Sequence, residues 1–164
     1  IDSANTTWVT NSADINHSVD YGFGKLNISG AIDMCKGRNG YSPYVSLGDE
    51  HNITTIEDIN STDFTIPNND INGIDVNITV SENKKVEWVG VYIDGNIDNF
   101  GEIELKLTSP NGTTTKLLHS NNSVGTASLN SETRFSSVAF LDENSSGVWT
   151  VNIADKNSNN QTNR

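Results

Sequence analysis

Apolar and polar residues alternate along the second half of the chain, and this period of two predicts β-strands. Isoleucine or valine occupies every second position between residues 74 and 80, and the pattern returns between residues 103 and 107. Residues 86–93 are apolar on both faces, which predicts a central strand. Further strands are expected at residues 116–119, 133–140 and 148–153. Several short strands joined by polar turns indicate a mainly β fold, an antiparallel jelly-roll-like β-sandwich.

The first 40 residues have a different pattern, with a period close to that of an α-helix. Asn27 is placed to cap a helix, and Gly37 and Gly40 are placed to end it. Between them the apolar residues recur on one helical face, at Ile28, Ala31, Ile32 and Cys35. The sandwich is therefore expected to be preceded by a short helical segment, which needs a surface to pack on because so short a helix is marginal in water.

Composition and charge narrow the classes of function. The chain has 164 residues and a net charge of −11, so nucleic acid is excluded as a partner by repulsion between the protein and the phosphate backbone. Calcium or a basic peptide, which carries positive charge, is electrostatically a more favourable partner than nucleic acid. Cys35 is the single cysteine, so no internal disulfide can form. No apolar run approaches the length of a membrane span.

Three short motifs stand out from the polar background. Ser109-Pro110-Asn111-Gly112 is a turn sequence, because proline presets φ at its second position and glycine accepts positive φ at its end. Gly147 and Trp149 form a Gly-x-Trp motif that leads into the strand ending at Asp155, with Trp149 expected in the core. Near the start of the chain lies the third motif, Tyr21-Gly22-Phe23-Gly24.

The order of these motifs resembles that in a subtilisin/kexin-type serine protease. Residues 64–155 are similar to the P domain (homo B domain) of kexin/furin-like proprotein convertases, with the Ser-Pro-x-Gly turn followed by Gly-x-Trp. The Tyr-Gly-Phe-Gly motif and the helix after it resemble the C-terminal end of the subtilase catalytic domain. The resemblance divides the chain into a catalytic-domain tail (residues 1–40), a connecting segment (41–63) and a P-domain sandwich (64–160). P domains continue with one more strand, which is not found here.

The resemblance implies a function without catalysis in this chain. Subtilases use an Asp, His and Ser triad, and the motif of the catalytic serine, Gly-Thr-Ser-x-Ala-x-Pro, is not found in the sequence. His17 lies close to the Tyr-Gly-Phe-Gly motif and is interpreted as structural. No catalytic residue is predicted. The expected role is to stabilise and regulate the parent's own catalytic domain, in a protein that is secreted or in the cell envelope of a bacterium.

A calcium site is a separate hypothesis. Asp94, Asn96 and Asp98 place oxygen side chains at alternate positions, and Glu102 follows closely. The spacing departs from that of an EF-hand, which requires glycine at the sixth position and glutamate at the twelfth. A plain hairpin loop remains the alternative interpretation of residues 94–99.

A second class of function stays open as well. A jelly-roll sandwich also serves as a stand-alone secreted module that binds carbohydrate or a surface protein. Exposed aromatic side chains beside a calcium loop favour sugar binding. The sequence offers Trp8, Tyr41, Tyr44 and Tyr92, of which Tyr92 is expected in a central strand. The Tyr-Gly-Phe-Gly motif weighs against this alternative.

Overall fold

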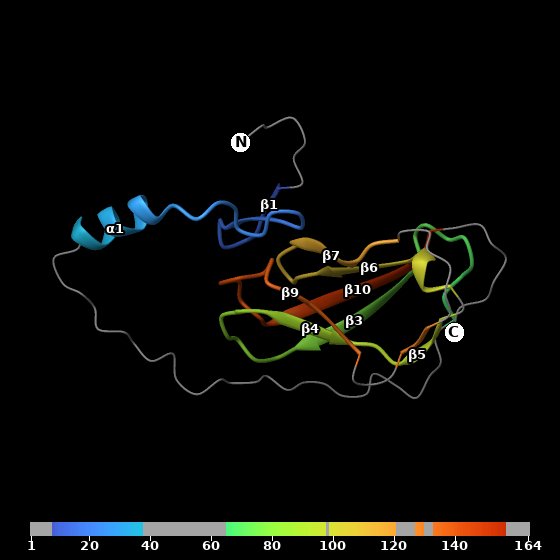
Figure 1. Ribbon diagram of the computed structural model, residues 1–164. Helices are drawn as coiled ribbons and strands as arrows, with labels where there is room; N and C mark the ends of the chain where they lie inside the picture. Colours follow the sequence, from blue (N-terminus) through green and yellow to red (C-terminus); the bar gives the residue numbers. More distant parts are fainter. Residues whose placement is uncertain (1–7, 38–64, 98, 121–126, 130–132, 157–164) are drawn as a thin grey trace.

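The computed structural model describes residues 8–37, 65–97, 99–120, 127–129 and 133–156 (Figure 1). The predicted connecting segment, the start of the sandwich at Phe64 and the candidate ligand Asp98 lie outside the described residues. Within the described part no helix is long and apolar enough to cross a membrane.

Four antiparallel strands form the larger sheet, in the order β3-β10-β6-β7. Their bounds are Ile74–Val80, Gly147–Asp155, Ile103–Thr108 and Thr114–Leu118 in that order. β10 lies between β3 and β6, with Trp149 opposite Ile78 and Val151 opposite both Val76 and Leu107. Each of these strands was expected from its alternating sequence, and β3 has the predicted bounds.

Two strand pairs lie outside this sheet. β4 (Val89–Tyr92) pairs with β9 (Arg134–Ser137), and β5 (Gly95–Ile97) pairs with β8 (Ala127–Leu129). A one-turn 3₁₀ helix, η1 (Phe100–Glu102), leads from β5 into β6. Val89, Val91 and Phe135 pack against the core of the larger sheet, so β4 and β9 form the second layer and the predicted β-sandwich is confirmed.

The prediction of a central strand at residues 86–93 is wrong. Among the described residues β4 has one partner strand, β9, and it covers only residues 89–92. Its alternate side chains point away from the core, leaving Trp88 48% and Tyr92 59% exposed. The run was apolar on both faces because two aromatic residues lie on the solvent side.

The N-terminal part consists of a small hairpin and a helix. β1 (Trp8–Thr10) pairs with β2 (Asn16–Ser18), and α1 spans Ile28–Gly37. The amide of Gly30 donates to Oδ1 of Asn27 at 2.9 Å, which confirms the predicted helix cap. Figure 1 shows the hairpin beside the β6–β7 end of the sandwich, while α1 projects away from it.

The core lies between the two layers. Its buried side chains are Val86, Leu105, Leu107, Phe140, Trp149 and Val151. Phe140 meets Trp149 edge to face, with ring centroids 5.0 Å apart. The indole N–H of Trp149 donates to the carbonyl of Ser145 at 2.8 Å, so the one polar atom of this buried ring is satisfied.

Replacing Trp149 by phenylalanine tests that hydrogen bond. The Trp149→Phe variant keeps an aromatic ring but leaves the buried Ser145 carbonyl without its donor, and we expect a loss of about 1–2 kcal/mol in the free energy of unfolding. Urea denaturation measures the change. Trp88→Phe is the matched control at an exposed position and is expected to cost less than about 0.5 kcal/mol. Equal losses in both variants would contradict the assigned role of the indole N–H.

Candidate docking site between the N-terminal segment and the sandwich

A single asparagine holds the N-terminal hairpin on the sandwich. The Asn11 side chain is 4% exposed, and its Nδ2 donates to the carbonyls of Ala139 and Leu141 at 3.1 and 2.9 Å. Its Oδ1 accepts from the amides of Ala13 and Ile15, both at 3.0 Å. One side chain therefore closes the β1–β2 loop and binds it to a distant part of the chain.

A buried glutamate completes this contact. Glu143 is 1% exposed, and its Oε1 accepts from the amide of Ser12 at 3.0 Å and from the hydroxyl of Thr113 at 2.5 Å. The amide of Ser12 also lies 3.2 Å from the Thr113 hydroxyl. We call Asn11, Ser12, Thr113 and Glu143 the docking contact. A depression of about 370 Å³ adjoins it, lined by residues 9–12 and 111–114.

The Tyr-Gly-Phe-Gly motif shapes the rest of the segment. Gly22 and Gly24 have φ of +58° and +94°, which favours glycine. A side chain on Gly24 would lie 3.2 Å from the Trp8 ring. Trp8 stacks on Tyr21, with centroids 6.3 Å apart, so the motif folds back on β1. It acts structurally in these contacts.

His17 is buried in the same segment, as the structural interpretation expects. Its ring meets Phe23 edge to face at 5.2 Å, and burial lowers the pKa of His17 below its ordinary value. The neutral imidazole is therefore the form that fits between β2 and the Tyr-Gly-Phe-Gly motif.

The two sandwich motifs meet each other beside the docking contact. In the predicted turn, the amide of Gly112 donates to the carbonyl of Ser109 at 2.9 Å, and Gly112 has a φ of +89°. Gly147 has a φ of +126°, and a Cβ there would lie 2.6 Å from Cβ of Pro110. Glycine is thus required at position 147 both by the backbone and by the close approach of the proline.

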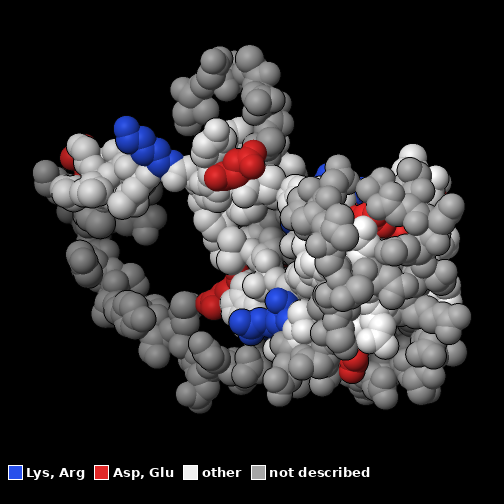
Figure 2. Space-filling model, turned by 45° about the vertical axis from the view of Figure 1, so that its right-hand side comes forward, with Lys and Arg blue, Asp and Glu red and all other residues white. Residues whose placement is uncertain are grey.

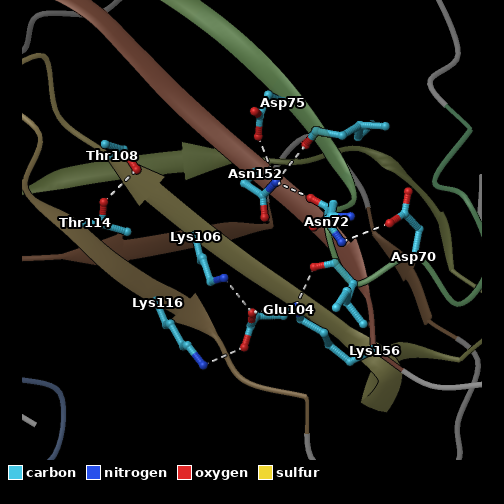
Figure 3. Close-up of polar contacts among 12 residues, drawn as sticks. Asp70, Asn72, Asp75, Glu104, Lys106, Thr108, Thr114, Lys116, Asn152 and Lys156 are labelled. Atoms are coloured by element: carbon cyan, nitrogen blue, oxygen red, sulfur yellow. Dashed lines mark hydrogen bonds and ion pairs between the residues drawn. The ribbon is translucent and has the colours of Figure 1, made fainter.

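The outward face of the larger sheet carries a second buried carboxylate (Figure 3). Glu104 is 5% exposed and lies within ion-pair distance of Lys106, Lys116 and Lys156, at 3.0, 2.6 and 3.3 Å. Burial raises the pKa of Glu104, but the hydrogen bonds from Lys116 and Lys106 outweigh it and hold the pKa at about 2. This cluster joins β6, β7 and the end of β10.

The candidate calcium ligands are only partly brought together. Asn96 lies on β5, not in a hairpin loop, so the loop interpretation of residues 94–99 is wrong for its central part. Glu102 is fully buried, and Nδ2 of Asn99 donates to its Oε1 at 2.5 Å. Asp155 is also fully buried, at the end of β10. The described residues contain no group of three His, Cys, Asp or Glu side chains suited to a metal, and Asp98 lies outside them.

Sequence reasoning missed the residues of the docking contact. Asn11 and Glu143 belong to polar stretches without periodicity, and more than a hundred residues separate Asn11 from Ala139 and Ser12 from Glu143. The sequence analysis assigns no role to Glu104. A signal was present at Glu104 and Lys106, since opposite charges fell on the outward side of an alternating strand.

The described chain is an antiparallel β-sandwich with a polar docking contact for the segment that precedes it. Residues 86–163 match the family model described as the proprotein convertase P-domain. The predicted resemblance to P domains is confirmed.

Solved structures agree on the fold. The chain is similar to the serine protease of Aeromonas sobria, both in its structure with the chaperone (TM-score 0.72) and in a structure titled for the protease itself (TM-score 0.70). The sequence identity is 23% in both comparisons, and the match covers 95% of this chain but 27% of the other. This chain therefore spans about a quarter of the length of those proteins. The comparison with curated proteins found no match.

Proposed function

We propose that this chain is the non-catalytic part of a subtilisin/kexin-like serine endopeptidase, in which the sandwich stabilises and regulates the catalytic domain. The observation that carries the proposal is the docking contact. It binds the segment that resembles the end of a subtilase domain to the P-domain sandwich through buried hydrogen bonds of Asn11 and Glu143. Such a contact fixes the position of one domain on the other.

The surface of the N-terminal segment supports the same proposal. Beyond the docking contact this segment exposes large apolar side chains to solvent, namely Tyr21, Phe23, Leu26, Ile28 and Ile32. Leu26 is 77% exposed, and in Figure 1 α1 projects away from the described strands of the sandwich. Apolar surface of this kind marks an interaction site. A catalytic domain that packs on this face would bury it.

The proposal is tested by joining the chain to the catalytic domain encoded with it. We expect the catalytic domain alone to lose activity faster at elevated temperature than the joined protein, and the chain alone to cleave no peptide substrate. The Leu26→Ser, Ile28→Ser double variant should lower the melting temperature of the joined protein, whereas Val148→Ser, exposed on the sandwich, should not. Equal half-lives with and without the chain would overturn the proposal.

The alternative of a stand-alone module that binds carbohydrate or a surface protein has less support. A free module gains nothing from an N-terminal segment that exposes several large apolar side chains. The parent protein is proposed to be secreted or attached to the cell envelope. Fractionation of cells that produce the intact protein tests this, and recovery from the cytoplasm alone would contradict it.

We also propose that calcium binds at Asp94, Asn96, Asp98 and Glu102. The support is the alternation of oxygen side chains at residues 94–98 and the complete burial of Glu102, which follows them in the sequence. A ligand that binds only the folded chain raises its melting temperature. We therefore expect millimolar calcium, compared with excess chelator, to raise the melting temperature of the wild type but not of Asp98→Asn. An unchanged melting temperature in the wild type would rule the site out.

A further inference from the structure

An exposed aromatic surface lies on the sandwich layer formed by β4 and β9. Gly90 and Tyr92 of β4, and Trp88 immediately before it, alternate with Val89 and Val91, which pack on the core, so the first three face outward. Arg134 lies opposite Tyr92, and Ser136 lies opposite Gly90. We call these five residues the aromatic face. No contact described above uses it.

Gly90 is required for the arrangement of this face. A Cβ at position 90 would lie 2.9 Å from Cδ of Arg134 and 3.0 Å from Cζ3 of Trp88. Because glycine leaves this space open, the Arg134 side chain crosses the strand and its guanidinium carbon lies 4.9 Å from the centroid of the Trp88 ring. Cation–π contact of this kind restrains both side chains.

Arg134 forms no ion pair with any residue that the structure describes. Its planar guanidinium carries five N–H donors, and stacking on Trp88 fixes their orientation. Tyr92, which is 59% exposed, adds a phenolic hydroxyl, and Ser136 adds an aliphatic one. The face therefore combines ring planes with fixed polar groups.

The spacing and charge of the face select the class of ligand. Trp88, immediately before β4, and Tyr92, at its end, are four residues apart, so their Cα atoms are at most about 13 Å apart. Gly90, which lies between them on the same side, carries no side chain. A peptide that is recognised by its side chains requires pockets for alternate side chains, and Gly90, at the centre of the face, has no side chain to form one. A net charge of −11 repels polyanions, and on the side in view in Figure 2 charged residues are scattered among uncharged ones.

We propose that the aromatic face binds a neutral polysaccharide. Sugar rings present apolar C–H faces that stack on Trp88 and Tyr92, and their hydroxyls accept hydrogen bonds from Arg134 and from the hydroxyls of Ser136 and Tyr92. This activity is independent of the docking contact, since the N-terminal hairpin binds at residues 113 and 139–143. Bound in this way, the sandwich would hold the protein on a glycan-bearing surface.

The proposal is tested by native affinity electrophoresis of the whole chain in gels that contain hydroxyethylcellulose, glycol chitin or pullulan, three neutral polymers. We expect at least one of them to retard the wild type. With that polymer, the apparent dissociation constant should rise at least tenfold in Trp88→Ala and about fivefold in Arg134→Lys, which keeps the charge but loses the planar fork. Val148→Ala, at an exposed apolar position on the other sheet, is the matched control and should bind as the wild type does.

Fluorescence gives a second readout that does not depend on mobility. In a Trp8→Phe background, Trp88 is the exposed indole and Trp149 is buried, so a polymer that covers Trp88 should shift the emission to shorter wavelength. Circular dichroism checks that each variant is folded. The proposal is overturned if none of the three polymers retards the wild type, if Trp88→Ala binds as the wild type does, or if polygalacturonate binds more tightly than every neutral polymer.

Discussion

Replacing Asn11 by alanine is expected to release the N-terminal hairpin from the sandwich. The side chain takes part in four hydrogen bonds at a buried position, and its removal leaves the carbonyls of Ala139 and Leu141 and the amides of Ala13 and Ile15 without these partners. Buried polar groups without hydrogen-bond partners are costly, and we expect the docked hairpin to be destabilised by about 3–4 kcal/mol relative to the released hairpin. This is a local loss, because the core between the two sheets does not include Asn11.

Amide hydrogen exchange measures that loss residue by residue. The amides of Ser12 and Ile15 should exchange at least a hundredfold faster in Asn11→Ala, while the amides of β10 keep their protection. Asn16→Ala is the control, because Asn16 lies in the same hairpin but is exposed and accepts a single side-chain hydrogen bond, from Thr10. If the two variants behave alike, Asn11 is not what holds the segment.

Replacing Glu104 by glutamine is expected to destabilise the sandwich itself by about 3 kcal/mol at pH 7. The variant leaves three lysine ammonium groups around a neutral amide where the wild type has a buried carboxylate. Urea denaturation gives the difference in free energy of unfolding. Glu82→Gln, at an exposed glutamate, is the control and should cost less than about 0.5 kcal/mol.

The difference in free energy of unfolding between the wild type and Glu104→Gln depends on pH, and the pKa of Glu104 fixes the sign of that dependence. That pKa is lowered from 4.5 to about 2 in the folded chain, because the lysine contacts outweigh the effect of burial. The carboxylate therefore contributes its full stabilisation above about pH 4.5 and loses it as the pH falls toward 2. The difference in free energy of unfolding between the wild type and Glu104→Gln should therefore become smaller as the pH falls from about 4.5 to 2. A difference that stays constant from pH 7 to pH 2 would contradict the assigned role.

Local patterns predicted the larger sheet better than the second layer. β3, β6 and β10 each have one buried face and one polar face, so their alternation was visible in the sequence. β4 was misplaced because Trp88 and Tyr92 face solvent, and hydrophobicity alone cannot distinguish an exposed aromatic residue from a core residue. β5 contains Gly95 and Asn96, whose turn preference hid a short strand.

The candidate sites also differ in how far local sequence patterns predict them. The turn at Ser109 and the core position of Trp149 follow from local rules, and both are confirmed. The docking contact depends on pairs of polar residues that become neighbours only in the folded chain, and no local pattern marks them. The sequence marks Gly147 as part of the Gly-x-Trp motif, but its approach to Pro110 links two motifs that the sequence presents separately.

The position of β10 has a consequence for the order of folding during synthesis. Of the described strands it is last in the chain, yet it lies in the middle of the larger sheet, between β3 and β6. Until a ribosome has translated residues 147–155, β3 and β6 each lack this neighbour and expose backbone groups that can pair with other chains. The carbonyls that accept from Asn11 are also translated some 130 residues after it. A nascent chain therefore has to keep β3 and β6 from aggregating until residues 147–155 have been translated.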